Sequence, residues 1–346
     1  MRILIATDAW HPQINGVVRT LQSLAAAART LGAEIEFLTP EGFPSFPLPT
    51  YRSIRCALPN PREIARRIEQ AAPDALHIAT EGPIGHMVRC YCLNRRLPFS
   101  SSYMTRFPEY ISTRLPIPAS WSYAVLRRFH AAAAVTMIST SSLMQELSNR
   151  GFKNLRIWAR GVDTDLFRPD RAAAALDLPR PIFASVGRIA VEKNLAAFLA
   201  LDLPGSKVVI GDGPQAAELR RRFPNAYFFG PMVGITLAAY LAAADVFVFP
   251  SRTDTFGVVQ LEALASGVPV AAYPVPGPKD VIGSNPIGAL DDNLGAACLR
   301  ALTISRDACR AFALTHSWES STRQFISHCQ RCTPVAVKMS LTEAAG

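Results

Sequence analysis

The chain has 346 residues, of which 49% are hydrophobic, and a formal net charge of +9. This length allows sizeable buried cores and predicts two domains rather than one. No apolar run reaches the roughly 18 residues of a membrane-spanning helix, and the N-terminal segment contains Asp8, unlike the apolar core of a signal peptide. We therefore expect a cytoplasmic protein, bound peripherally at the inner face of a membrane if it contacts one.

The first half of the chain alternates strand and helix patterns, which is typical of a parallel sheet built from βαβ units. A long proline-rich connection, residues 43–61, interrupts the alternation. The predicted strands are Ile3–Ala6, Ile35–Leu38, Ala75–Ile78 and Ala132–Ile138, and the predicted helices are Val17–Leu31, Arg62–Ala71, Gly85–Asn94 and Trp121–Phe129.

A second cycle of strands and helices starts after Pro169. The two cycles predict an α/β protein of two Rossmann-like, doubly wound domains, residues 1–168 and 169–315, which face each other across a ligand cleft. A last helical stretch, about residues 316–332, is expected to pack back on the first domain. The predicted strands of the second cycle are Ile182–Val186, Lys207–Ile210, Tyr227–Phe229, Val246–Phe249 and Val268–Ala272, and its helices include Gln215–Arg222 and Leu237–Ala243.

The basic excess lies in the first half of the chain. Residues 1–168 hold 20 Lys and Arg against 12 Asp and Glu, whereas residues 169–346 hold 16 against 15. Nucleic acid, an anionic membrane surface or simple solubility could each account for such a charge. Because no zinc-finger spacing or RNP-type aromatic motif occurs, we expect no nucleic-acid partner and favour contact with an anionic membrane surface.

The seven cysteines are expected to be free thiols, since the chain shows no export signal. Cys329 and Cys332 form a lone C-x-x-C. Without a second pair or a set of histidines, this spacing favours ordinary thiols over a metal or redox site, so no metal is expected.

The stretch from Ser251 to Tyr273 is the most informative part of the sequence. It follows a buried apolar strand and should form a loop, a helix that starts near Phe256, and another strand. Val258, Leu261 and Ala265 share one helix face, and Glu262, four residues after Val258, falls on the same face, where a core residue is expected. A buried carboxylate is often only paired with a neighbouring charge. Asp254, in the preceding loop, favours a ligand instead, because open α/β sheets bind ligands at this edge.

Main-chain N–H groups near Phe256, Gly257 and Val258 are suited to a phosphate, because the first turn of a helix leaves them unpaired. The two carboxylates, Asp254 and Glu262, could bind two hydroxyl-bearing parts of the same ligand. The combination suggests a sugar, a diphosphate and a ribose.

Three further loops follow predicted strands on the same sheet edges. Gly16 precedes a helix, where glycine lets a diphosphate approach the backbone, although a purely structural turn explains it equally well. Glu81 lies in a second loop. Arg188 and Lys193 lie in a third, where two cations suit a pyrophosphate held without a metal, or are simply solvated charges.

Together these motifs resemble those of retaining glycosyltransferases of family 4, which have the two-domain GT-B fold. The resemblance spans nearly the whole chain. The matching segments are N-G-V at 15–17, E-G-P-I-G at 81–85, T-R-F-P-E-Y at 105–110, R-G-V-D at 160–163, F-R-P at 167–169, G-R-I-A-V-E-K-N at 187–194, G-D-G-P at 211–214, A-D-V-F-V-F-P-S at 244–251 and T-D-T-F-G-V-V-Q-L-E-A-L-A-S-G-V-P-V at 253–270.

The resemblance implies a role for each matching residue. Arg188 and Lys193 would bind the donor diphosphate and stabilise the leaving group. Gly16 would approach the same phosphates, Asp254 would contact hydroxyls of the donor sugar, and Glu262 would hold the ribose. The other implied substrate contacts are Phe256, Gly257 and Val258 near the sugar and phosphate, with Glu81 and Arg106 in the first domain. Members of this type generally need no metal.

One position departs from the family pattern. Similar sequences carry a histidine just before T-R-F-P-E-Y, close to the reacting sugar, and here the residue is Met104. Methionine supplies no charge and only a weak hydrogen-bond acceptor. The resemblance therefore leaves open a variant that binds a nucleotide sugar but is impaired in transfer.

The resemblance favours transfer of a sugar from UDP-glucose or UDP-glucuronate to a membrane lipid such as diacylglycerol, with retained configuration. A GDP-mannose-dependent α-mannosyltransferase is the alternative. A dinucleotide-dependent dehydrogenase is disfavoured, because residues 7–16 lack a G-x-G-x-x-G turn.

Overall fold

The computed structural model describes residues 1–12, 16–48, 51–112, 118–171 and 176–332. The chain forms two compact units. Unit 1 comprises Met1–Ala159 and the C-terminal segment that starts at Glu319, and unit 2 comprises Arg160–Trp318. Each unit contains a six-stranded sheet whose neighbouring strands all pair in parallel.

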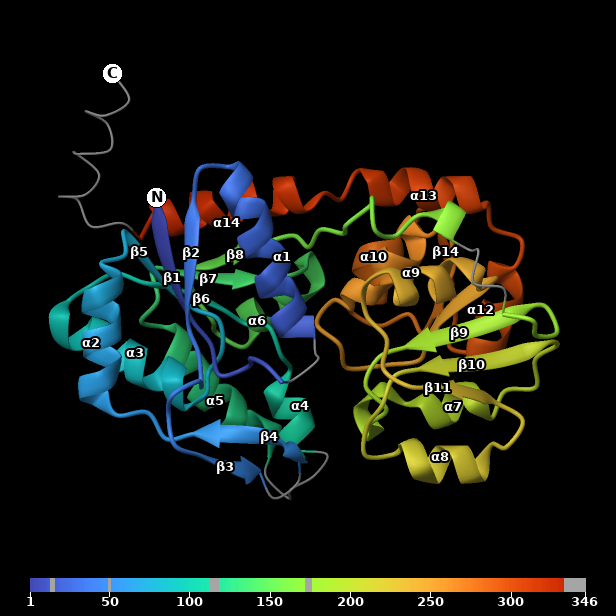
Figure 1. The fold of residues 1–346 in the computed structure, drawn as a ribbon, viewed down its shortest axis with the longest axis horizontal. Coiled ribbons are helices and arrows are strands. Elements are labelled where there is room, and N and C mark those ends of the chain that lie inside the picture. Colours follow the sequence, from blue (N-terminus) through green and yellow to red (C-terminus); the bar gives the residue numbers. More distant parts are fainter. Residues whose placement is uncertain (13–15, 49–50, 113–117, 172–175, 333–346) are drawn as a thin grey trace. The chain divides into compact units, whose positions relative to one another are not determined.

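The sheet of unit 1 has the strand order β2-β1-β5-β6-β7-β8, and a two-stranded antiparallel sheet, β3-β4, lies beside it (Figure 1). Its strands are β1 Arg2–Ala6, β2 Glu34–Leu38, β3 Ser45–Leu48, β4 Tyr51–Ala57, β5 Ala75–Ile78, β6 Ser100–Ser102, β7 Val135–Ile138 and β8 Leu155–Ile157. Its helices are α1 Gly16–Thr30, α2 Pro61–Ala71, α3 Pro83–Arg95, α4 Phe107–Ser112, α5 Ala119–His130, α6 Ser141–Asn149 and α14 Trp318–Gln330.

Apolar clusters fill both faces of this sheet. Leu21 and Leu24 of α1 pack with Phe325 of α14 on one face, and Ile64 of α2 packs with Val88 of α3 on the other. Successive side chains of a strand point to opposite faces of its sheet. In β1, Ile3 and Ile5 therefore belong to the cluster of α1 and α14, and Leu4 and Ala6 belong to the cluster of α2 and α3. Both faces are covered, as parallel sheets require.

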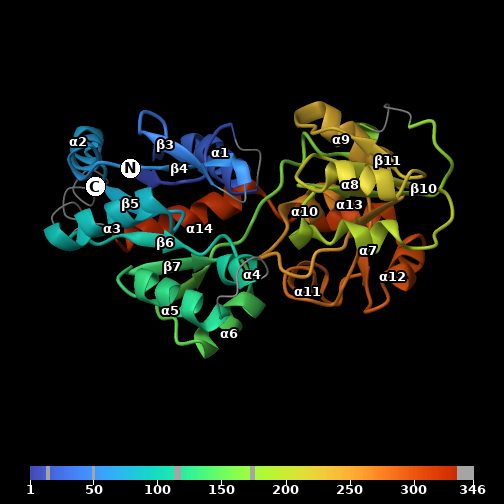
Figure 2. The same ribbon diagram turned by 90° about the horizontal axis from the view of Figure 1, so that it is seen from below.

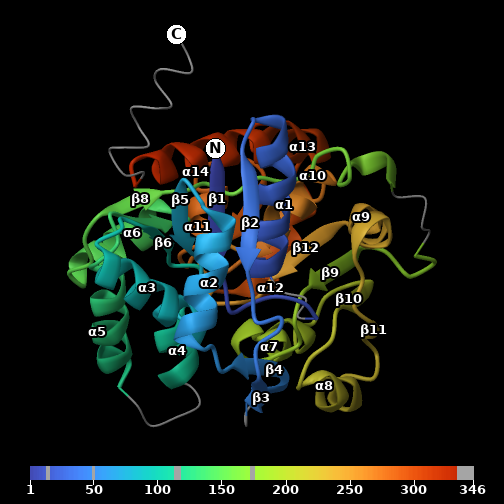
Figure 3. The same ribbon diagram turned by 60° about the vertical axis from the view of Figure 1, so that its left-hand side comes forward.

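The sheet of unit 2 has the order β11-β10-β9-β12-β13-β14, and its strands β9 to β12 are labelled in Figure 3. Its strands are β9 Ile182–Val186, β10 Ser206–Ile210, β11 Tyr227–Phe229, β12 Val246–Phe249, β13 Val270–Ala272 and β14 Gly288–Leu290. Its helices are α7 Leu195–Leu199, α8 Ala216–Arg222, α9 Gly234–Ala243, α10 Val258–Ala265, α11 Pro278–Ile282, α12 Leu294–Ala301 and α13 Arg306–Leu314, with short 3-10 turns at Pro169–Arg171 and Val191–Lys193.

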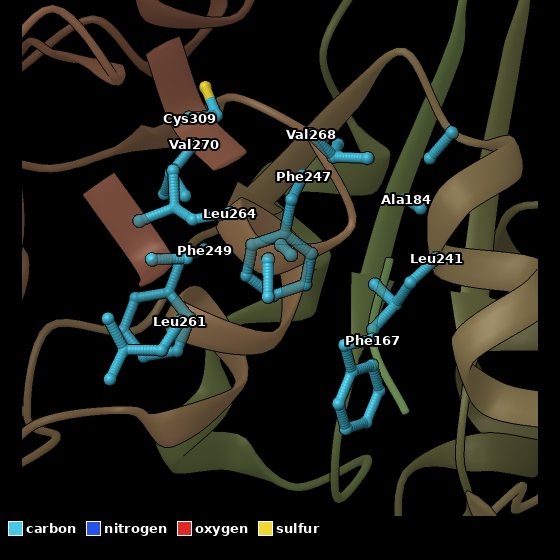
Figure 4. Close-up of a cluster of buried hydrophobic side chains, with 14 of the residues drawn as sticks. Phe167, Ala184, Leu241, Phe247, Phe249, Leu261, Leu264, Val268, Val270 and Cys309 are labelled. Carbon is cyan, nitrogen blue, oxygen red and sulfur yellow. The ribbon is translucent and has the colours of Figure 1, made fainter. Parts of the chain in front are cut away.

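Strand β12 shows how the apolar run predicted as a strand is used. Phe247 and Phe249 point to the cluster that contains Leu261 and Leu264 of α10 (Figure 4), whereas Val246 and Val248 belong to the cluster on the opposite face. All four residues of the strand are buried, because helices cover both faces. This packing fixes the position of the loop that leaves the strand at Pro250.

The boundary between the units lies nine residues before the predicted one at 168/169. The connector packs with unit 2 because Val162 forms a parallel bridge with Ser317, and Phe167 lies in the unit 2 core. Arg310 of α13 also donates hydrogen bonds to the carbonyls of Thr164 and Phe167, at 2.9 and 2.7 Å. Helix α14 packs on unit 1, where the indole Nε1 of Trp158 donates to Ser321 Oγ at 3.1 Å.

Two features of unit 1 were not predicted. The connection at 43–61, expected as a long proline-rich segment, contains the β3-β4 hairpin, and the segment before Met104 contains a strand, β6, with the sequence Ser-Ser-Ser. The serines are buried on both faces of the sheet and are paired with histidines, as buried polar groups must be. Ser100 and Ser102 contact the two ring nitrogens of His77 at 2.9 and 3.0 Å, and Ser101 contacts Nδ1 of His130 at 2.9 Å.

All seven cysteines are free thiols. Among the described residues, no helix combines the length and the apolar character needed to cross a bilayer.

Candidate functional site

The loops with the donor-site candidates leave neighbouring strands of unit 2. The strand order reverses between β9 and β12, which pair directly, and ligands of open α/β sheets bind beyond the carboxyl ends of the strands at such a point. Residues 187–194 follow β9, and residues 250–257 follow β12. The fold therefore brings the predicted cationic loop and the predicted acidic loop to the same place.

The two loops are bonded to each other. Lys193 Nζ donates to Asp254 Oδ1 at 2.6 Å, Asn194 Nδ2 donates to the carbonyl of Pro250 at 3.2 Å, and Ser251 Oγ donates to the carbonyl of Glu192 at 3.2 Å. The side chains of Lys193 and Asp254 are 28% and 12% exposed. A hydrogen bond between charged groups of this kind contributes about 1.5–3 kcal/mol. Two residues predicted to bind the donor are thus each other's partners.

Three buried polar atoms in this loop and the start of α10 lack a hydrogen-bond partner among the residues that the structure describes. They are Thr253 Oγ1, Asp254 Oδ2 and Gln260 Oε1. A buried polar atom without a partner costs about 1–3 kcal/mol, so several of them in eight residues need an explanation other than stability. They mark the stretch as a candidate for function.

The turn before α10 depends on Gly257. Its φ of 80° and ψ of 72° lie in the left-handed region that glycine enters without strain. A Cβ at this position would lie 2.6 Å from Cζ of Phe249. Helix α10 begins at Val258, two residues later than predicted, because this glycine ends the turn, and Phe256, Gly257 and Val258 are all half-buried.

Glu262 lies in the second turn of α10 and is 4% exposed. Every residue from Gln260 to Ala265 is buried, so the burial of Glu262 does not depend on its being on the predicted inward face of the helix. The helix is enclosed because α9, α11 and α13 pack around it. The structure therefore places Glu262 on the helix that follows the acidic loop, without the two-faced pattern expected from the sequence.

Arg188 is half-buried, and the loop that carries it is hydrogen-bonded to the loop after β10. Ile189 N donates to the carbonyl of Asp212 at 2.9 Å, and Gln215 N donates to the carbonyl of Ile189 at 3.1 Å. A Cβ on Gly211 would lie 2.0 Å from the carbonyl oxygen of Gly187, so only glycine permits this approach. The G-D-G-P segment thus supports the loop that carries the predicted cations.

In unit 1, Gly16 is the first residue of α1, which follows β1. A Cβ there would meet no atom within 4 Å, so the fold itself does not require glycine at this position. Asn15, the preceding residue of the N-G-V segment, lies outside the described residues.

Glu81 is held inside unit 1. Its Oε1 lies 3.0 Å from Nε2 of His130, and the two side chains are 3% and 1% exposed. Nδ1 of the same histidine contacts Ser101, so a continuous buried chain joins Glu81, His130 and Ser101. The structure thus gives the Glu81 carboxylate a partner within its own unit.

Met104 follows β6 and is 9% exposed. It packs in the apolar cluster that contains Ile3, Leu21 and Phe325. The residue at the position of the family histidine is therefore part of a hydrophobic core.

Arg106 lies in a buried ion cluster between α4, α5 and α6. Its Nη2 is 2.8 Å from Oε2 of Glu146, and its Nη1 is 3.5 Å from Oε1 of Glu109. The hydroxyl of Tyr123 donates to Glu109 and also lies 3.1 Å from Oε1 of Glu146. Burial acts to raise the pKa of Glu146, but the charge and hydrogen bond of Arg106 outweigh it, so the pKa is lowered overall.

Glu146→Gln is expected to lower the free energy of unfolding by about 1–3 kcal/mol at neutral pH, because buried Arg106 loses a charged partner. The folded-state pKa of Glu146 is below its usual 4.5, so its contribution is present above that pH and is lost as the pH falls through the folded value. Urea unfolding should therefore show a difference from the parent protein that shrinks below about pH 4.5. The exposed pair of Glu319 and Arg323 supplies the control, since Glu319→Gln should change little at any pH. A difference that grows in acid would contradict the assignment.

Comparison with known proteins decides the family. Residues 14–166 match the family model described as Glycosyltransferase Family 4, and residues 180–303 match the model described as Glycosyl transferases group 1. The chain belongs to glycosyltransferase family 4. The family predicted from the sequence motifs is therefore confirmed, and the protein is a transferase.

The glycosyltransferase is similar to a GDP-mannose-dependent alpha-mannosyltransferase from Mycobacterium tuberculosis, with 29% identity over 84% of this chain and 83% of the relative. It is also similar to an alpha-monoglucosyldiacylglycerol synthase from Streptococcus pneumoniae, with 26% identity over 89% of this chain and 79% of the relative. Among solved structures, a sucrose-phosphate synthase from Thermosynechococcus elongatus superposes with a TM-score of 0.77, 20% identity and 99% coverage of both chains. The predicted GT-B fold is confirmed.

Sequence reasoning missed three residues of this glycosyltransferase. Asp8, at the end of β1, accepts hydrogen bonds from Ile84 N and Gly85 N, at 2.8 and 3.3 Å, and so occupies the N-terminus of α3. Burial raises the pKa of Asp8, and these amide donors oppose the shift. His130 and Gln260 are the others. Of the three, only Asp8 had a signal in the sequence, which is its position just after a predicted strand. His130 and Gln260 belong to no motif that would have marked them.

Proposed function

We propose that this glycosyltransferase moves a hexose from a nucleoside diphosphate sugar to a membrane lipid, with retention of configuration and without a metal. The carrying observation is the joined pair of loops in unit 2, where Lys193 and Asp254 meet at 2.6 Å beside the Gly257 turn. A positioned cation can stabilise a leaving diphosphate, and carboxylate oxygens can accept hydrogen bonds from sugar hydroxyls. Arg188, in the same loop as Lys193, would add a second positive charge.

GDP-mannose is our first candidate donor. The motifs alone favoured UDP-glucose or UDP-glucuronate. The relative from Mycobacterium tuberculosis, which its name describes as GDP-mannose-dependent, matches at 29% identity, against 26% for the diacylglycerol glucosyltransferase. Both relatives are covered along most of their length, so the comparison supports this order and keeps UDP-glucose second.

A lipid acceptor is supported by helix α5 of unit 1, which is labelled in Figure 2 and carries two exposed apolar side chains. Trp121 and Val125 are 71% and 60% exposed, and they share a helix face by their i, i+4 spacing. Arg127 and Arg128, in the last turn of the same helix, are also exposed. Tryptophan favours the interface of a bilayer, and arginine is attracted to anionic lipid headgroups. This face therefore has the chemistry of a surface that binds anionic membranes.

The test of the function is product analysis with labelled GDP-mannose, UDP-glucose and UDP-glucuronate, each offered with vesicles of a total bacterial lipid extract and with diacylglycerol vesicles. We expect label from GDP-mannose in the organic phase, and release of the labelled sugar by an α-specific glycosidase would identify an α-linked glycolipid. Transfer only to water-soluble acceptors would contradict the lipid proposal, and label from a UDP sugar alone would reverse the order of donors.

Removing the apolar face of α5 is expected to weaken membrane binding. In the double variant Trp121→Ser, Val125→Ser, we expect the partition constant on anionic phosphatidylglycerol vesicles to fall by about tenfold or more, since each lost apolar contact contributes about 1 kcal/mol or more. Sedimentation at low salt measures it. Ile235→Ser removes a side chain of similar exposure, 62%, from unit 2 and should leave sedimentation unchanged. Equal binding by all forms would exclude α5 as the membrane contact.

An impaired enzyme remains the second candidate, because apolar Met104 stands where the resemblance implies a histidine. Met104→His is expected to raise transfer or donor hydrolysis by about tenfold or more, since a hydrogen-bonding group near the reacting sugar would be restored. The measurement is turnover with the preferred donor. Met137→His changes a buried methionine of the same cluster and is the control, from which we expect lost stability without any gain in turnover. Equal turnover by Met104→His and the parent would show that the position does not limit the reaction.

A further inference from the structure

The third residue of α10, Gln260, is fully buried beneath the turn that precedes the helix. Its Nε2 donates to the carbonyl of Phe256 at 2.7 Å, and the same nitrogen lies 2.9 Å from the place that a Cβ of Gly257 would occupy. Its main-chain N donates to the carbonyl of Gly257 at 2.9 Å. The side chain therefore contacts the turn at both residues and fixes the direction of the Phe256 carbonyl.

This contact determines the orientation of a peptide group. In a planar trans peptide the C=O and the following N–H point in opposite directions. Because the Phe256 carbonyl points to the buried Gln260 amide, the N–H of Gly257 must point away from it, toward the partly exposed side of the turn. Glycine allows such a peptide to rotate more easily than any other residue does, since its φ and ψ are the least restricted.

The amide is not explained by stability. Gln260 Oε1 is buried and has no hydrogen-bond partner in the part of the chain that the structure describes. Burying an unpaired acceptor costs free energy that a methionine of similar length would avoid. The presence of Gln260 despite this cost is better explained by its effect on the Phe256 carbonyl. Without the Gln260 amide, this carbonyl could turn outward, and its negative oxygen would then face the place where an anionic diphosphate is proposed to bind.

We propose that Gln260 is a positioning residue that keeps the Phe256–Gly257 peptide in the orientation that accepts an anion. Its Nε2 holds the carbonyl inward, and the outward Gly257 N–H and the first turn of α10 then present positive dipole ends to the donor diphosphate. This inference rests on the proposed function only in assuming that the diphosphate of the donor binds at this turn. It does not depend on the sugar, the nucleobase or the acceptor.

The test uses the full chain with GDP, UDP and inorganic pyrophosphate as probes in titration calorimetry, alongside thermal unfolding. Gln260→Met keeps the length of the side chain and removes the amide. We expect about tenfold weaker binding of all three probes, since one charge-assisted interaction is lost, while the unfolding temperature is unchanged or higher. Gln260→Glu has the same shape and lacks the donor hydrogens when ionised, so it should weaken binding at least as much.

The matched control is Ser266→Ala. Ser266 follows the last turn of the same helix, is equally buried, and donates from its hydroxyl to the carbonyl of Glu262 at 3.0 Å. Its replacement removes one side-chain hydrogen bond to a carbonyl far from the turn, so it should lower the unfolding temperature and leave binding unchanged.

Parent-like probe binding by Gln260→Met would overturn the proposal, and so would equal weakening by Ser266→Ala, which would indicate a merely structural effect. Because pyrophosphate carries neither sugar nor base, these outcomes are independent of the product analysis. A failure of the proposed lipid transfer would leave the probe-binding result standing, and the reverse also holds.

Discussion

Replacing Lys193 by methionine is expected to lower kcat/KM for sugar transfer by about 10²–10³-fold, the range that follows from the loss of one preorganised group facing developing charge. Methionine keeps the apolar stem of lysine and removes the ammonium, so the loop should retain its packing. The ammonium lies at the switch point of the unit 2 sheet, where Lys193 Nζ is 2.6 Å from Asp254 Oδ1. Initial rates at several donor concentrations give the measurement, and Lys153→Met, at an exposed lysine of unit 1, is the control.

A double-mutant cycle separates two roles of this lysine. If Lys193 only neutralises Asp254, then adding Asp254→Asn to Lys193→Met should restore much of the activity, because no unpaired carboxylate is left. If Lys193 binds the donor diphosphate, the double variant should stay as inactive as Lys193→Met. Unchanged kcat/KM in Lys193→Met itself would remove the lysine from the mechanism.

Gly257→Ala is expected to lower the free energy of unfolding by about 2–4 kcal/mol, the sum of left-handed backbone strain and an overlap in the core. The φ of this residue is 80°, and the added Cβ would lie 2.6 Å from the ring of Phe249. The ring belongs to the packed cluster of β12 and α10 and has little room to move (Figure 4). Donor binding should weaken as well, since the turn that carries the Gly257 N–H would be displaced.

Gly230→Ala is the control for this substitution. Gly230 does not have a positive φ, and a Cβ there would meet no atom within 4 Å. Chemical unfolding should therefore show a stability close to that of the parent protein. If both alanine variants had the same stability, the conformation of the turn before α10 would differ from the one described.

Much of the fold was predictable because its strands are strongly apolar. The run Val246–Phe249 identifies a strand buried on both faces, and the position of the loop after it follows from the order of strands and helices. The contact between the loops of Lys193 and Asp254 was harder to predict, because no local sequence pattern indicates that β9 and β12 are neighbours in the sheet. That arrangement depends on the reversal of strand order, which the alternation of elements suggests without fixing its position.

The features that the sequence did not reveal have a common physical cause, which is that local patterns do not show distant partners. Three serines in a row do not predict a strand, and β6 forms because His77 and His130, far away in sequence, satisfy its hydroxyls. Glu81 and Arg106 were predicted as substrate ligands from their motifs. Their partners, His130 and Glu146, come from α5 and α6 and could not be assigned from spacing. The direct test of their roles in binding is still the affinity of variants for the donor and acceptor.

The path of the chain between the units has a consequence for biosynthesis. Unit 2 is continuous in sequence, whereas unit 1 is completed only by the segment that starts at Glu319. Because a chain is synthesised from its N-terminus, the first 159 residues emerge long before α14. Yet Phe325 of α14 fills the core of unit 1, and Ser321 accepts a hydrogen bond from Trp158. The domain that is made first is thus expected to finish folding last, with an apolar face in need of protection until translation ends.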